Sequence, residues 1–137
     1  MKRILVLVVE DEQFLTRVLK DNLEAEGFMV DLAANGDEAI DHLHKNRPDL
    51  ILLDILMPKR DGFFVLGEVR KNPEWKGLPV IVLSNLGGDT EIKKALEMGA
   101  DNYFVKSQHP IEEVVQEVRN YLVGENKKEA KIGEVSS

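Results

Sequence analysis

The sequence contains no cysteine, which excludes a disulfide framework and any metal site built from thiolates. It also lacks an apolar run close to the roughly 20 residues that a membrane-spanning helix needs. Residues 4–9 are apolar and follow Lys2 and Arg3 as in a secretory signal, but the run is short and residues 10–12 are acidic. We therefore expect a cytoplasmic protein with no membrane partner.

Basic residues are in the minority, because 18 Lys and Arg stand against 25 Asp and Glu, for a net charge of −7. A negative field repels nucleic acids and acidic lipid surfaces. We therefore expect no direct binding to nucleic acid, and a cationic partner or a metal ion fits the composition better.

The chain has 137 residues, which is room for one ordinary domain and a short appendage. Hydrophobic residues make up 43% and charged residues 31% of the chain, as in proteins that fold around a core. The apolar periodicity stops near residue 123. We predict a domain over residues 1–123 and a polar flexible tail or linker stump over residues 124–137.

Apolar runs recur at regular intervals, and the segment after each run has apolar residues at helical spacing. The expected strands span residues 4–9, 28–33, 50–53, 80–83 and 103–105. Gly27 is placed to end the first helix, and Pro110 is tolerated in the first turn of the last one. The alternation predicts an α/β fold with a doubly wound (βα)5 open parallel sheet and helices on both faces. Its ligand crevice lies beyond the carboxyl ends of the strands.

Polar residues of particular kinds follow four of the expected strands, namely Glu10 and Asp11, Asp54, Ser84 and Lys106. Three carboxylates in one crevice repel one another, and a raised pKa or a bound cation relieves the repulsion. Mg2+ prefers one or two carboxylates together with water and phosphate oxygens, so it suits this set better than Ca2+ does. The lysine and the serine hydroxyl can contact phosphoryl oxygens. These are the parts needed to form an aspartyl phosphate.

Each of these residues also has a plainer interpretation. Asp54 could form a turn, and Ser84 could cap the following segment. Residues 10–12 could be an acidic cluster that the helix dipole favours, and Lys106 could be a solvated surface lysine. Tyr103, on the short fifth strand, could simply fill space in the core.

The order and spacing of several short motifs are more specific than any single residue. The motifs are Val9-Glu10-Asp11-Glu12, Leu53-Asp54-Ile55-Leu56-Met57-Pro58 with Asp61-Gly62, Leu83-Ser84, Gly99-Ala100-Asp101-Asn102-Tyr103, and Lys106. From about residue 2 to residue 122, the sequence resembles the response regulator receiver domains of two-component signalling. These domains have the flavodoxin-like fold of the chemotaxis response regulators, so the resemblance implies the strand order 2-1-3-4-5.

The resemblance also implies a set of residues around an aspartyl phosphate and a magnesium ion. Asp54 would be the phospho-acceptor. Asp11 would bind Mg2+ directly, and Glu10 would act through water. Asp54 and the backbone carbonyl of Leu56 would complete the protein ligands.

Three further residues would contact the phosphoryl group or respond to it. Ser84 and Lys106 would contact the group, and Tyr103 would be an aromatic switch that turns inward when Ser84 moves. The sequence departs from the family pattern beside two of these positions. Ser107 stands where a proline with a cis bond is usual, so this loop either stores strain or takes a trans path that places Lys106 differently. Asn85 stands where a small residue is usual, and its amide could cover the phosphoryl site or position water there.

The implied function is a phosphorylation-controlled signalling switch that accepts a phosphoryl group on Asp54 from a sensor histidine kinase or a phosphotransfer protein. The cofactor would be Mg2+. The output would be altered binding to a downstream protein, or to a second copy, through the fourth helix, fifth strand and fifth helix. Such a domain is regulatory rather than an enzyme, and its chemistry is limited to self-catalysed phosphoryl transfer and hydrolysis of the aspartyl phosphate.

Two other interpretations remain open. The first is a protein-binding module that keeps the fold but does not rely on phosphorylation, with Ser107 and Asn85 disabling the switch. The second is a small flavin or nucleotide binder, which fold analogy permits although the sequence has no G-x-G-x-x-G or Walker pattern.

Overall fold

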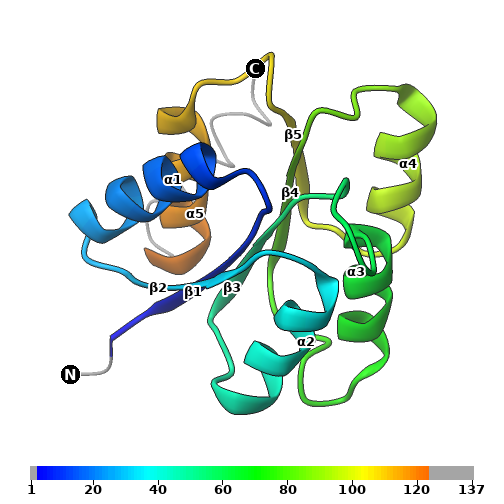
Figure 1. Ribbon diagram of the computed structural model, residues 1–137, viewed down its shortest axis with the longest axis horizontal. Coiled ribbons are helices and arrows are strands. Elements are labelled where there is room, and N and C mark those ends of the chain that lie inside the picture. The colour runs from blue at the N-terminus through cyan, green and yellow to red at the C-terminus, as the bar shows by residue number, and fades with distance from the viewer. Residues whose placement is uncertain (1–2, 124–137) are drawn as a thin grey trace.

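Five strands and five helices alternate along the computed structural model, which describes residues 3–123 (Figure 1). The strands are β1 (Leu5–Val9), β2 (Met29–Ala33), β3 (Leu50–Leu53), β4 (Val80–Ser84) and β5 (Asn102–Val105). The helices are α1 (Gln13–Ala25), α2 (Gly36–Lys45), α3 (Gly62–Lys71), α4 (Asp89–Glu97) and α5 (Ile111–Val123). The predicted polar tail over residues 124–137 lies outside the described residues.

The strand boundaries agree with the sequence pattern to within one residue. The third strand is as predicted, whereas β2 begins one residue late because Phe28 belongs to the turn that ends α1. Its N–H donates to the carbonyl of Leu23 on that helix, at 3.2 Å. Gly27 lies just after the helix, as predicted. Its φ of 95° is a backbone conformation that residues with a Cβ rarely adopt.

All five strands are parallel, and their order in the sheet is β2-β1-β3-β4-β5, as the resemblance implied. Helices α1 and α5 lie on one side of the sheet, and α2, α3 and α4 lie on the other (Figure 1). Successive strand residues point to opposite faces. On β1, Leu7 and Val9 therefore join the core under α2, α3 and α4, while Val6 and Val8 join the core under α1 and α5.

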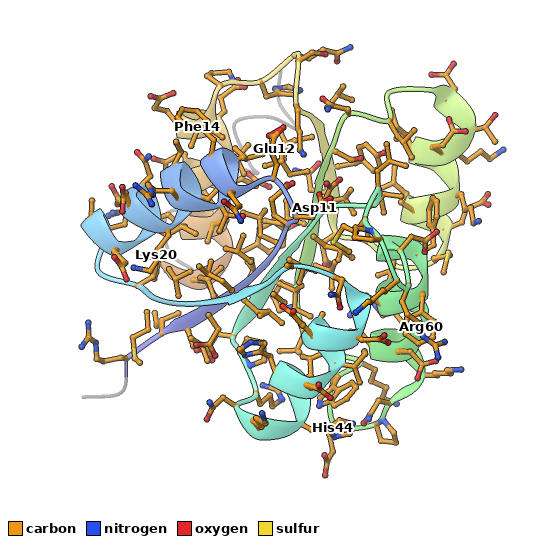
Figure 2. All side chains as sticks on the ribbon, viewed as in Figure 1. Asp11, Glu12, Phe14, Lys20, His44 and Arg60 are labelled. Carbon is orange, nitrogen blue, oxygen red and sulfur yellow. The ribbon has the colours of Figure 1, made fainter. Side chains whose placement is uncertain are left out.

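Helix α1 shows how the amphipathic helices attach to this sheet. Leu19 and Leu23 are buried against the sheet, whereas Phe14 in the first turn is 80% exposed. Figure 2 shows Phe14 near the start of the helix, away from the sheet. Within residues 3–123, neither α1 nor any other helix is long and apolar enough to span a membrane.

The contrast on α1 gives a direct test of where the core lies. We expect Leu23→Ala to lower the free energy of unfolding by about 2–5 kcal/mol, because Leu23 is fully buried and alanine leaves a cavity. Phe14→Ala, on the same helix, should change it by less than about 0.5 kcal/mol. Urea denaturation followed by circular dichroism measures both values. Equal losses in the two variants would contradict the burial described here.

Candidate functional site

The parallel sheet brings the predicted site residues together at one edge. Backbone hydrogen bonds continue the ladder just beyond the strands, because the N–H of Asp54 donates to Val9 at 2.9 Å and the N–H of Lys106 donates to Ser84 at 2.8 Å. The N–H of Glu10 likewise donates to the carbonyl of Ala33 at 2.9 Å. The first residue after each of these strands is therefore held in register with its neighbour, which fixes where its side chain starts.

The three predicted carboxylates form one cluster. Glu10, Asp11 and Asp54 each offer an oxygen, and these oxygens all lie within 4.8 Å of one another. Glu10 and Asp54 are each only 4% exposed, whereas Asp11 is open to solvent. Figure 2 shows Asp11 at the end of β1, in the middle of this edge of the sheet. An open hollow of about 730 Å³ beside α1 reaches Glu10 and Asp11, so an ion can approach from that side.

Lys106 lies between the two buried carboxylates. Its Nζ atom is 3.0 Å from Oε1 of Glu10 and 3.3 Å from Oδ2 of Asp54, and its side chain is 14% exposed. Burial by itself lowers the pKa of Lys106, but the negative charges of Asp54 and Glu10 outweigh it, so the net pKa is raised. The lysine is therefore charged at neutral pH and offsets part of the repulsion within the cluster.

The surroundings of Glu10 in this cluster shift its pKa. Burial, and after it the negative charge of Asp54, raise the pKa of Glu10 from 4.5 to about 7, against the opposing hydrogen bond from Lys106. The N–H of Glu12 also donates to Oε2 of Glu10, at 3.1 Å. Without a cation beyond Lys106, the cluster takes up a proton near neutral pH.

Ser84 and Tyr103 both bond to the backbone of Leu86, a residue that no sequence motif indicated. The hydroxyl of buried Ser84 accepts from the N–H of Leu86 at 3.3 Å, and the Tyr103 hydroxyl donates to the carbonyl of Leu86 at 2.6 Å. Burial is the main cause that raises the pKa of Tyr103. The β4–α4 loop, residues 85–88, is therefore held by both predicted switch residues. No side-chain pattern signals Leu86, because only its backbone takes part.

Leu56 lies in the loop between β3 and α3, and its side chain is exposed. Its N–H donates to Oδ1 of Asp54 at 3.3 Å, which holds one oxygen of that carboxylate. The start of α3 packs tightly under this loop, since the N–H of Gly62 donates to Ile55 at 2.9 Å. A Cβ atom on Gly62 would overlap the carbonyl oxygen of Asp54. Gly62 was part of the sequence motif, but its contact with Asp54 was not foreseen.

The two departures from the family pattern are located beside the cluster. Residues 3–123 contain no cis peptide bond, so the chain takes the trans path through Lys106 and Ser107. Lys106 nevertheless reaches both Glu10 and Asp54. Asn85 is exposed, directly after buried Ser84.

This fold and this cluster match a known family. The family model of the response regulator receiver domain matches residues 6–119. The chain belongs to this family. Receiver domains are regulatory signalling domains of two-component systems that interact with histidine kinases and bind Mg2+ at an acidic pocket.

Individual relatives agree with this assignment. The chain is 44% identical over 101 residues to the phosphate regulon transcriptional regulatory protein PhoB of Rhizobium meliloti, which covers 74% of this chain and 44% of that protein. The chain spans less than half the length of the curated relatives that it matches.

Solved receiver structures have the same fold. A response regulator from Chloroflexus aurantiacus has a TM-score of 0.82 and 33% identity, with 89% of this chain and 99% of that chain covered. The phosphorylated cyanobacterial phytochrome response regulator RcpA has a TM-score of 0.76 and 30% identity, with 85% and 89% covered.

The charges around Glu10 give a test by titration. Asp54→Asn should lower the pKa of Glu10 from about 7, because it removes a neighbouring negative charge, and Lys106→Met should raise it, because it removes a cation. Carbon NMR of the Glu10 carboxyl group in magnesium-free buffer measures both shifts. An unchanged pKa in both variants would contradict the described cluster.

The same shift makes stability depend on pH. The pKa of Glu10 in the folded state lies above its ordinary value of 4.5, so the folded state binds more protons than the unfolded state between pH 4.5 and about pH 7. The contribution of Glu10 to the free energy of unfolding is thus fully present below pH 4.5 and is lost as the pH rises through about 7. Urea denaturation at several pH values should show this loss for the wild type and not for Glu10→Gln.

Proposed function

We propose that the chain accepts a phosphoryl group on Asp54 from a histidine kinase or a phosphotransfer protein, with Mg2+ bound, and thereby changes its affinity for a protein partner. The observation that carries the proposal is the cluster itself. Asp54 is buried beside two further carboxylates and lies 3.3 Å from the ammonium group of Lys106. We propose residues 1–123 as the switch domain.

The donor set fits a magnesium ion. Glu10, Asp11 and Asp54 supply carboxylate oxygens, and Mg2+ prefers oxygen ligands at about 2.0–2.1 Å while keeping several waters. Asp11 is the exposed member and would bind the ion directly, with Asp54 and the carbonyl of Leu56, while Glu10 would act through water. When bound, the ion would neutralise charge on the phosphoryl oxygens.

The side chains of this cluster would have different roles in the phosphoryl transfer. A carboxylate oxygen of Asp54 would form the new bond to phosphorus as the bond to the donor histidine breaks, and that histidine would keep the electron pair. Lys106 would donate a hydrogen bond to a phosphoryl oxygen, since its ammonium group already lies beside Asp54. Burial of Asp54 excludes bulk water from the attacking oxygen.

The response to phosphorylation would pass through Leu86. If the hydroxyl of Ser84 turns toward a phosphoryl oxygen, the N–H of Leu86 loses its acceptor and the β4–α4 loop is released. The Tyr103 hydroxyl, which donates to the carbonyl of Leu86, would then turn inward. The phosphoryl group would favour one of two existing states by contacting it differently.

The surface that changes would comprise α4, β5 and α5, and its partner would be a downstream protein or a second copy of the chain. The similarity to transcriptional regulators that are longer than this chain adds an effector region of the same polypeptide to the candidate partners.

The acceptor assignment is tested by intact mass spectrometry after incubation with a small acyl phosphate and Mg2+. We expect the wild type to gain one phosphoryl group and Asp54→Asn to gain none. Asp11→Asn should slow the gain by about 10-fold or more, because it removes a metal ligand. A phosphoryl group that persists in Asp54→Asn would rule out Asp54 as the acceptor, and a gain that is equally fast with a chelator present would rule out the role of Mg2+.

The switch assignment is tested with Ser84→Ala, which should still be phosphorylated but should lose the response of the β4–α4 loop. Amide NMR spectra with and without the acyl phosphate should show shifts for Leu86 and α4 in the wild type and much smaller shifts in the variant. Mass spectrometry of the same samples controls for equal phosphorylation. Absence of the shifts in phosphorylated wild type would favour the phosphorylation-independent binding module.

A further inference from the structure

The loop between β3 and α3 contains two residues in an unfavourable backbone conformation. Lys59 and Arg60 have φ angles of 46° and 59°, in the left-handed region that residues with a Cβ rarely adopt. Nothing in the local sequence favours this conformation, because neither residue is glycine, asparagine or aspartate. Contacts with another part of the molecule must therefore hold the loop in place.

Gly36, the first residue of α2, makes that contact. Its N–H donates to the carbonyl of Arg60 at 3.1 Å. A Cβ atom at Gly36 would overlap that carbonyl oxygen and would lie 2.6 Å from the Cβ of Arg60. The backbone of Gly36 is not itself left-handed, so a side chain is excluded by Arg60 rather than by the conformation of Gly36. We call this contact the Gly36–Arg60 latch.

The side chain of Arg60 reinforces the latch. Its Nε atom donates to Oδ1 of Asp37 on α2, at 3.2 Å, and its guanidinium group lies 4.5 Å from the ring centre of Phe64 on α3. Figure 2 shows Arg60 beside α3. The ion pair between Arg60 and Asp37 is exposed and therefore weak. The close backbone contact at Gly36 is thus the feature that a small substitution would change most.

The other part of the loop is fixed to the candidate site. Gly62 packs against the carbonyl of Asp54 and its N–H donates to the carbonyl of Ile55, which holds residues 54 and 55 at the start of the loop. Leu56 lies between these held residues and Arg60, and its N–H donates to Oδ1 of Asp54. A displacement forced at Arg60 would therefore fall on residues 56–60, which include the proposed carbonyl ligand.

We propose that Gly36, on a helix that contributes no ligand, is a positioning residue for the metal and phospho-acceptor site and acts through the latch on the loop that carries Leu56. This inference rests on the proposed function, because the property that it governs is Mg2+ affinity. Coupling between two sites is reciprocal, so bound Mg2+ should also stabilise the latch.

The test compares Mg2+ binding to wild type and Gly36→Ala by isothermal titration calorimetry. We expect about 10-fold weaker binding in Gly36→Ala, the range found when the support of a metal ligand is removed. Gly77→Ala is the matched control, because a Cβ at Gly77 meets no atom within 4 Å, and its affinity should equal that of the wild type. Val118→Ala, in the core under α5, controls for a general loss of stability.

A second measurement needs no variant. In the wild type, Mg2+ should slow hydrogen exchange of the Gly36 amide, whose acceptor is Arg60, by several-fold. The amide of Asn46 at the other end of α2, which donates to His42 at 2.8 Å, should exchange at an unchanged rate. This measurement applies even if Gly36→Ala fails to fold.

The outcomes separate the two proposals. If the wild type binds no Mg2+, the proposed function and the proposed role of Gly36 are both overturned. If the wild type binds Mg2+ but Gly36→Ala binds it equally well, or Val118→Ala loses as much affinity, only the role of Gly36 is overturned. An exchange rate of the Gly36 amide that Mg2+ does not alter would overturn the latch in the same way.

Discussion

The arrangement of side chains at the carboxyl ends of the strands depends on the ammonium group of Lys106, which lies between Glu10 and Asp54. Two buried carboxylates side by side would be strongly unfavourable without a cation, and removal of one partner from a buried ion pair typically destabilises a protein by about 3–5 kcal/mol. Lys106 alone does not balance three carboxylates. The cluster therefore stays negative when Glu10 is ionised, which leaves it able to attract a further cation.

The strand order explains why the cation between Glu10 and Asp54 is a lysine. Lys106 follows β5 and Glu10 follows β1, with β4 and β3 between them in the sheet. Neighbouring strands are about 4.8 Å apart, so β1 and β5 are separated by three spacings, or roughly 14 Å, and only long side chains can meet across that gap. Ser84 is the last residue of β4, between them in the sheet, and its buried side chain is short. Topology and side-chain length together select which residues meet.

Much of this arrangement could be predicted from sequence, because buried parallel strands are continuous apolar runs and their carboxyl ends share one edge. The positions of Glu10, Asp54 and Lys106 followed from that rule. The left-handed Arg60 and the contact at Gly36 did not follow, since each depends on segments distant in sequence. A raised pKa within the three carboxylates was one of the two expected outcomes, but the sequence did not indicate that Glu10 would have it. The sequence also left two paths open at Lys106 and Ser107, and only the fold selects the trans path.

Leu86 illustrates how a contact made by backbone atoms can escape a comparison of sequences. Ser84 and Tyr103 both bond to its peptide groups, one to the N–H and one to the carbonyl, while its own side chain packs against the core under α2, α3 and α4. Most replacements would keep both bonds, and proline alone would remove the N–H. Natural sequences are therefore free to drift at position 86 without altering the connection between the two polar side chains, so variability there would not indicate that the position is unimportant.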